Sequence, residues 1–126
     1  MIDFIRKHIE SEKNAFEGIA SALRTEPNMR IEFVISAFVL LAALLLNCTR
    51  VEWLFILSAI FGVIVAETVN TAIEDLGDAI TKKYDEKIKR AKDVAAASVV
   101  YSAIYALLVG VVIFMPKLIT VINFLL

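Results

Sequence analysis

Charge-free apolar stretches alternate with short charged segments along the chain. Three stretches carry no Asp, Glu, Lys or Arg, and they cover residues 33–46, 53–66 and 94–115. A helix needs about 20 apolar residues, at 1.5 Å each, to cross a hydrocarbon core of roughly 30 Å. The third stretch is long enough alone, the first depends on its polar ends, and the second crosses only if Glu67 lies inside or close to the membrane. The pattern predicts three membrane helices, at about 29–49, 51–78 and 92–115.

A different pattern precedes the first apolar stretch. Large apolar side chains recur every three or four residues with charges between them, at Ile2, Ile5, Ile9, Phe16, Ile19 and Leu23. Such spacing is typical of an amphipathic helix lying on a membrane surface, here expected over residues 1–26. Pro27 favours a bend before the first span, and Pro116 marks the outer end of the third span. The C-terminal tail at 116–126 is too short to cross back, so it is either an interfacial helix or an extension of the third span.

The connections between the spans predict their arrangement. Residues 47–52 form so short a connection that the first two spans must be antiparallel neighbours. Of the 13 Lys and Arg residues, eleven precede the first apolar stretch or lie between the second and the third; the other two are Arg50 and Lys117. Because positive residues favour the cytoplasmic side, we expect the N-terminus and the 79–93 loop in the cytoplasm and the C-terminus outside. The expected fold is an all-α membrane protein, a single domain over 1–126 with an N-terminal surface helix and three transmembrane helices.

Composition supports a membrane protein. Hydrophobic residues make up 60% of the 126 residues, against about 45–50% in soluble domains, and the mean hydropathy is +0.77. A globule of this size has too little interior to hide that much apolar surface. The net charge of −1 gives no field that would attract nucleic acid. The single cysteine, Cys48, and the single histidine, His8, exclude an intrachain disulfide and a His-rich metal site.

The strongest candidate for chemistry is a row of polar side chains at the cytoplasmic end of the second span. At 100° per residue, Glu67, Asn70, Glu74 and Asp78 fall within an arc of roughly 80° on one helix face. A carboxylate in the membrane at Glu67 is costly, by up to about 2.5–3.5 kcal/mol, and its position suits a general base for a lipid hydroxyl. The alternative is that Glu67 pairs with a base and Asn70 makes an interhelical hydrogen bond. Four acceptors without an internal base favour the functional interpretation, and hard oxygen ligands favour Mg²⁺.

Two charged clusters flank this row. The first covers residues 24–32 at the entry to the first span, where the hairpin allows Glu26 to approach Glu74 and share a metal ion. The second covers residues 89–93, where Lys92 and Asp93 occupy the first turn of the third span and a helix N-terminus favours phosphate oxygens. Either cluster also fits an ordinary interfacial charge belt. The sequence has no Gly-rich phosphate loop, so a phosphate site would depend on metal, lysine and helix ends.

With these clusters, the sequence resembles the small prokaryotic lipid kinase family of bacterial diacylglycerol kinase and undecaprenol kinase. The resemblance extends from about Ala15 to Lys117. It rests on three motifs: Arg24-Thr25-Glu26-x-Asn28, Glu67-x-x-Asn70-Thr71-Ala72-Ile73-Glu74 with Asp78, and Ala91-Lys92-Asp93 followed by Ala95-Ala96-Ala97. The resemblance implies a homotrimer with shared active sites near the cytoplasmic membrane surface. It also implies transfer of the γ-phosphate of MgATP to a lipid alcohol.

The resemblance assigns roles to individual residues. Glu67 would be the catalytic base for the lipid hydroxyl, and Asn70 would support the site by hydrogen bonding. Glu26 and Glu74 would bind Mg²⁺ and order the triphosphate. Four further residues would contact the nucleotide: Lys92, Asp93, Lys7 and Asn14. The last two lie on the surface helix, where this chain has Glu12 and Glu17 at positions that often carry a basic or aromatic residue in the family.

Two alternatives stay open at this point. Residues 24–28, the alanine run after Asp93 and residues 113–118 look closer to the undecaprenol kinase branch, which makes undecaprenyl phosphate, than to the diacylglycerol branch, which makes phosphatidic acid. A protein of another class, a small oligomeric cation channel or multidrug exporter subunit, also keeps a glutamate in the membrane. Such a protein would require neither Glu26 nor the Lys92-Asp93 pair, and its activity would not depend on MgATP. For a lipid kinase the expected location is the bacterial cytoplasmic membrane.

Overall fold

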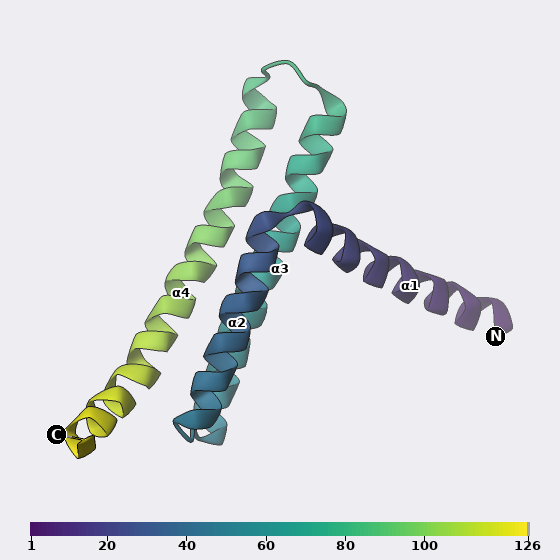
Figure 1. Ribbon diagram of the computed structural model, residues 1–126. Helices are drawn as coiled ribbons and strands as arrows, with labels where there is room; N and C mark the ends of the chain where they lie inside the picture. The colour runs from purple at the N-terminus through teal and green to yellow at the C-terminus, as the bar shows by residue number, and fades with distance from the viewer. Residues whose placement is uncertain (126) are drawn as a thin grey trace.

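The computed structural model describes residues 1–125, with the side chains of Ile2, Asp3 and Leu125 left aside. Over these residues the chain forms four helices and no strand: α1 (Ile2–Thr25), α2 (Pro27–Leu45), α3 (Arg50–Ile80) and α4 (Glu86–Leu125). The last three are long and apolar enough to cross a membrane. The expected all-α fold, with one N-terminal helix and three spans, is therefore confirmed (Figure 1). Leu126, the last residue of the expected tail, lies outside the described residues.

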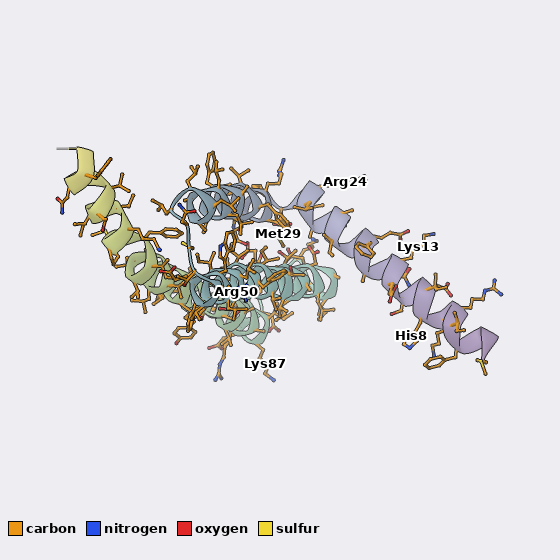
Figure 2. All side chains as sticks on the ribbon, turned by 90° about the horizontal axis from the view of Figure 1, so that it is seen from below. His8, Lys13, Arg24, Met29, Arg50 and Lys87 are labelled. Carbon is orange, nitrogen blue, oxygen red and sulfur yellow. The ribbon has the colours of Figure 1, made fainter. Side chains whose placement is uncertain are left out.

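A sharp turn at Glu26 separates α1 from the other helices. Glu26 has an extended backbone, with φ −100° and ψ 111°. Proline disfavours helical backbone in the residue before it, and Pro27 itself starts α2, where its missing N–H is not needed. As a result α1 projects away from the bundle of α2, α3 and α4 (Figure 1). Figure 2 shows His8 and Lys13 out along this projecting helix.

The α2–α3 turn closes one end of the hairpin. Asn47 takes a left-handed backbone conformation with φ 49°, which asparagine tolerates better than most residues. Thr49 then starts α3 with a capping box: its N–H donates to Oε2 of Glu52 at 2.6 Å, and the N–H of Glu52 donates to its Oγ1 at 3.3 Å. Glu52 also pairs with Lys117 of α4 at 3.1 Å. This end therefore links α4 to the hairpin.

The buried core lies next to this turn. Ala43 of α2, Ile56 of α3 and Ile113 of α4 form its buried cluster, and flanking residues such as Trp53 and Phe114 pack against it. Most large apolar side chains of the three spans instead point outward, among them Phe38, Leu54 and Leu107, each 68% exposed. In water such surface would be unfavourable by about 25 cal/mol for each Å², whereas lipid tails cover it without cost. The bundle is thus built to be surrounded by hydrocarbon.

The long helices α3 and α4 position the polar row. At 1.5 Å per residue, the 31 residues of α3 span about 46 Å, more than a hydrocarbon core of roughly 30 Å. Its last turns therefore extend beyond the apolar layer, and α4 packs against them after a short loop (Figure 1). The helix α4 begins at Glu86, six residues before the predicted start, because Oδ1 of Asp85 accepts the N–H groups of Lys87 and Ile88 at 2.8 and 3.1 Å.

The helix α4 also continues beyond the predicted end of the third span. Pro116 lies inside the helix, which runs on to Leu125. A proline removes one backbone hydrogen bond, and helices in a membrane tolerate this because neighbouring groups satisfy the freed carbonyl. Of the two expectations for the tail, the structure therefore has a helical extension of the third span.

Candidate active site

The polar row on α3 is buried where it faces the rest of the bundle. Glu67 is 4% exposed, and Asn70 and Thr71 are each 8% exposed. Positions three and four residues apart share a helix face, so the three side chains lie on one side of α3. A buried carboxylate in this apolar bundle is unfavourable unless it is used or partnered.

Asn70 connects the row through a single hydrogen bond. Its Nδ2 donates to Oε1 of Glu74 at 3.0 Å, one helical turn further along α3. Its Oδ1 is buried and has no hydrogen-bond partner in the described part of the chain. Buried polar atoms are normally satisfied, so an unpartnered amide oxygen beside a carboxylate marks a place where a ligand can bind.

The structure adds one residue that sequence reasoning did not single out. Glu32 of α2 is a carboxylate on the helix next to α3, and the charge of Glu67 on α3 acts on it. Oε2 of Glu32 is buried and, among residues 1–125, has no hydrogen-bond partner. Its sequence signal was the one used for Glu67: a carboxylate directly bordering a charge-free span. Only the three-dimensional structure shows that this oxygen is buried.

A second connection joins α3 to α4. Nζ of Lys92 donates to Oδ1 of Asp78 at 2.5 Å and forms an ion pair with it. The lysine reaches Asp78 by lying across Gly77, which is buried: a Cβ on Gly77 would be 2.8 Å from Cε of Lys92 and 3.0 Å from Cγ2 of Ile88. The absence of a side chain at residue 77 therefore allows Lys92 to reach the polar row.

We expect Gly77→Ala to change the site more than the stability of the fold. The Lys92 side chain is flexible enough to move away from the new Cβ, and alanine favours a helix by roughly 1 kcal/mol over glycine. Moving the lysine breaks its contact with Asp78 and displaces its charge, so an activity that depends on this site should fall about tenfold with little change in thermal unfolding. Steady-state kinetics and a melting curve in detergent check this, with Gly62→Ala as control because a Cβ there meets no atom within 4 Å.

The structure separates the two residues of the Lys92-Asp93 pair. Whereas Lys92 is half-buried and reaches Asp78, Asp93 is exposed and pairs with Lys89 of its own helix at 2.5 Å. Adjacent helical residues point about 100° apart, so the two side chains serve different surroundings. Their assignment as nucleotide contacts stays a prediction, and Lys92 lies beside the polar row.

The remaining candidates lie at or beyond the α1–α2 junction. Glu26 is half-buried at the turn itself. Lys7 and Asn14 are exposed on α1, which leaves the bundle, so in one chain they lie away from α3 and α4 (Figure 1). Within the described residues, no three His, Cys, Asp or Glu side chains gather as a metal site. The roles of these residues stay predictions.

The donors near Glu74 nevertheless suit Mg²⁺. This ion prefers oxygen ligands and is commonly held by one or two protein carboxylates together with substrate phosphates. Glu74 and the unpartnered Oδ1 of Asn70 are oxygen donors of that kind, and Glu26 would supply a second carboxylate. A preformed cluster of three protein ligands is not required for such a site.

An apolar groove lies beside the polar row. It has a volume of about 450 Å³ and runs between α1, α2 and α3. Its walls include Ala22 of α1, Phe33 and Leu40 of α2, and Phe61 and Thr68 of α3. Thr68 is the wall residue of α3 nearest its polar end, and it directly follows Glu67 in the chain, but Glu67 itself is not one of the wall residues. Its size lies within the range of small-molecule sites, about 300–1,000 Å³.

Together these features are those of an integral membrane enzyme whose polar site lies at the end of α3, where α3 connects to α4. The sequence model of the family described as prokaryotic diacylglycerol kinase matches residues 13–114. The chain therefore belongs to the prokaryotic diacylglycerol kinase family of lipid kinases. It is a bacterial membrane protein and a phosphotransferase that acts on an alcohol group. Membership of this family favours a lipid kinase over the channel or exporter alternative.

Individual relatives give the same result. The chain is 35% identical over 114 residues to undecaprenol kinase of Bacillus subtilis, covering 90% of this chain and 93% of that protein. It is 31% identical over 91 residues to diacylglycerol kinase of Haemophilus influenzae, covering 72% and 77%. It is 28% identical over 100 residues to diacylglycerol kinase of Escherichia coli, covering 79% and 82%.

Proposed function

We propose that this protein transfers the γ-phosphate of MgATP to undecaprenol at the cytoplasmic surface of the membrane. The observation that carries the proposal is Glu67, a carboxylate buried in a membrane helix whose other residues, up to Thr68, form one wall of an apolar groove. A lipid chain lying in this groove would place its terminal hydroxyl near the carboxylate, at the depth where the apolar layer ends.

The residues of the chain divide the work of the reaction. Glu67 takes the proton of the lipid hydroxyl while the hydroxyl oxygen forms a bond to the γ-phosphorus. The bond from the γ-phosphorus to the bridging oxygen breaks, and ADP leaves. Lys92 balances negative charge on the phosphates, and Asn70 holds Glu74 in place. Phosphoryl transfer depends on such positioning and charge neutralisation more than on covalent chemistry.

A magnesium ion, when bound with ATP, neutralises charge on the phosphate oxygens. Glu26 and Glu74 would hold it. Asn70, whose Oδ1 has no hydrogen-bond partner in the described residues, lies four residues before Glu74 on the same helix face. Lys7 and Asn14 project away from this site in one chain, so the proposal includes a homotrimer in which α1 of one subunit approaches the site of a neighbour. The extensive outward apolar surface of α2–α4 allows such association in lipid.

The choice of undecaprenol rests on similarity along the whole chain. The undecaprenol kinase of B. subtilis matches at 35% identity and over nearly its full length, whereas the diacylglycerol kinases of H. influenzae and E. coli match at 31% and 28%. Diacylglycerol is the alternative acceptor, because the same base, groove and phosphate site would serve it.

The test is transfer of labelled γ-phosphate from MgATP in mixed micelles, with undecaprenol and diacylglycerol offered separately. We expect label on undecaprenol with a higher kcat/KM. Label mainly on diacylglycerol would support a lipid kinase but would contradict undecaprenol as its substrate. No label on either lipid, with the protein folded, would contradict the proposed function.

The orientation in the membrane can be tested at Cys48, the single cysteine, in the turn between α2 and α3. The proposed topology places this turn outside, so an impermeant maleimide should label Cys48 in intact cells. In a Cys48→Ser background, Lys83→Cys in the α3–α4 loop should label only after permeabilisation. The reverse pattern would invert the topology.

The rate of this labelling should depend strongly on pH. Burial raises the pKa of the Cys48 thiol, Lys117 partly offsets this and Glu52 adds to it. Because the thiolate is the reactive species, its fraction at neutral pH is smaller than for an ordinary cysteine. Labelling in detergent should therefore keep rising about tenfold for each pH unit beyond the pH at which an unfolded control levels off.

A further inference from the structure

The projecting helix α1 carries an apolar stripe that nothing in the chain covers. At 100° per residue, five large apolar side chains fall within an arc of roughly 40°. They are Ile5, Ile9, Phe16, Ile19 and Leu23. Most of the stripe is open, with Phe16 71% and Ile9 62% exposed. An aligned apolar surface of this kind is unfavourable in water, so it needs an apolar surrounding.

Three basic residues follow one edge of this stripe. On the same helical projection, Arg6, Lys13 and Arg24 fall within roughly 20° of one another and about 60–80° from the centre of the stripe. All three are exposed. Figure 2 shows Lys13 and Arg24 on one side of α1 and His8 on the other. The first two basic residues also border a hollow in the surface of α1, whose walls are Ile5, Arg6, Ile9, Glu10 and Lys13.

The acidic residues of α1 leave this basic edge largely unneutralised. Lys13 pairs with Glu17 at 3.7 Å, but the two side chains are 73% and 66% exposed, and such exposed pairs are weak. Among the described side chains, neither Arg6 nor Arg24 forms an ion pair. Glu12 lies on the opposite edge of the stripe. The two edges therefore differ in charge.

The fold turns the stripe toward the lipid. The helix α1 runs out sideways from the start of α2 (Figure 1). The charge-free part of α2 begins at Phe33, six residues after Pro27, or about 9 Å along the helix. The headgroup layer of a bilayer is about 5–8 Å thick on each side, so α1 starts at its level. Ile19 of the stripe lines the apolar groove together with Phe33 and Phe61 of the spans, so the stripe faces the side on which the spans lie.

We propose that α1 is a docking surface for anionic phospholipids. The apolar stripe lies among the acyl chains, and the basic edge of Arg6, Lys13 and Arg24 binds the headgroups. Long basic side chains lay their stems along apolar surface and carry the charge outward, and each one near an anionic leaflet shifts the docking equilibrium about fivefold. Lys7 and Asn14 project from the face opposite the stripe and stay in water. The docking does not depend on the proposed function.

The test measures the depth of α1 in the full-length protein in lipid nanodiscs. In a Cys48→Ser background, a nitroxide on Ile9→Cys reports on the stripe, and one on Ser11→Cys reports on the other face. Collisions with oxygen, which concentrates in lipid, and with a water-soluble nickel chelate measure depth. Shielding of the Ile9 label from nickel should be at least about fivefold greater in phosphatidylcholine with about one-third phosphatidylglycerol than in phosphatidylcholine alone. The Ser11 label should stay accessible in both bilayers.

Removing charge separates the basic edge from the apolar stripe. One combined variant replaces the three residues of the edge: Arg6→Gln, Lys13→Gln and Arg24→Gln. It should shield the Ile9 label equally in the two bilayers. The matched control removes three exposed lysines at and just after the α3–α4 loop: Lys82→Gln, Lys83→Gln and Lys87→Gln. It should keep the difference between the bilayers, because these lysines are not part of α1.

Salt provides a second measurement that needs no charge variant. Raising the ionic strength from about 0.1 M to about 1 M shortens the screening length from about 10 Å to about 3 Å. Shielding of the Ile9 label in the anionic bilayer should then fall toward its value in phosphatidylcholine. Equal shielding in both bilayers at low salt would overturn the proposal, as would an edge variant that behaves like the control. A label shielded from both oxygen and nickel would place a second copy of the chain on the stripe instead of lipid.

Discussion

Replacing Glu67 with Gln should lower kcat for lipid phosphorylation at least 100-fold, the low end of the range of about 10²–10⁴ for general-base catalysis. Gln has nearly the same shape and fills the same buried position, so the fold is retained, but its amide cannot take the hydroxyl proton. Because the nucleotide is held by other side chains, KM for MgATP should change less than about threefold. Steady-state kinetics with each substrate varied in turn check both values.

The matched control for Glu67→Gln is Asp75→Asn, which removes an exposed carboxylate from the same helix. It should leave kcat and both KM values close to those of wild type. Glu67→Asp separates proton transfer from placement, because it keeps the carboxylate but shortens the side chain by one carbon. Full activity in Glu67→Gln would remove the assignment of Glu67 as the base and would favour its structural interpretation.

Replacing Lys92 with Met should raise KM for MgATP about 10–100-fold. The methionine keeps most of the apolar stem that crosses Gly77 but removes the charge, and a hydrogen bond to a charged group contributes about 1.5–3 kcal/mol. Lys87→Met is the matched control, since Lys87 is an exposed lysine near the start of the same helix. Kinetics in MgATP and direct binding of a non-hydrolysable ATP analogue provide the measurement.

The partner of Lys92 distinguishes nucleotide binding from a structural ion pair. Asp78→Asn breaks the same contact but leaves the lysine charge in place. If Lys92 binds phosphate, Asp78→Asn should affect KM for MgATP much less than Lys92→Met does. Equal effects of the two substitutions, with no further loss in the double variant, would limit Lys92 to holding α4 against α3.

The polar row shows how far local sequence reasoning extends. Glu67, Asn70 and Glu74 lie on one helix face because the helical repeat places them there. The structure adds the burial of Glu67 and Asn70 and the Asn70–Glu74 hydrogen bond. The predicted approach of Glu26 to Glu74 depends on how the chain turns at Pro27 and on how α2 packs against α3. Such a contact cannot be derived from periodicity, and it stays a prediction.

The bounds of the helices show a similar division. The capping box at Thr49 and the charge-free stretches are local signals, and α2 and α3 begin within two residues of the expected positions. The start of α4 and its passage through Pro116 were less predictable, because an aspartate cap and a tolerated proline depend on which backbone groups find partners.

By itself, the sequence determined the class of this protein, its three spans and the row of oxygen donors on α3. These follow from hydrophobic length and helical repeat, which are properties of a single segment. Only the tertiary structure decided that Oε2 of Glu32 is buried and that Lys92 crosses Gly77 to reach Asp78. Contacts between helices depend on their rotation and closest approach, and these are set by side-chain packing along the whole interface.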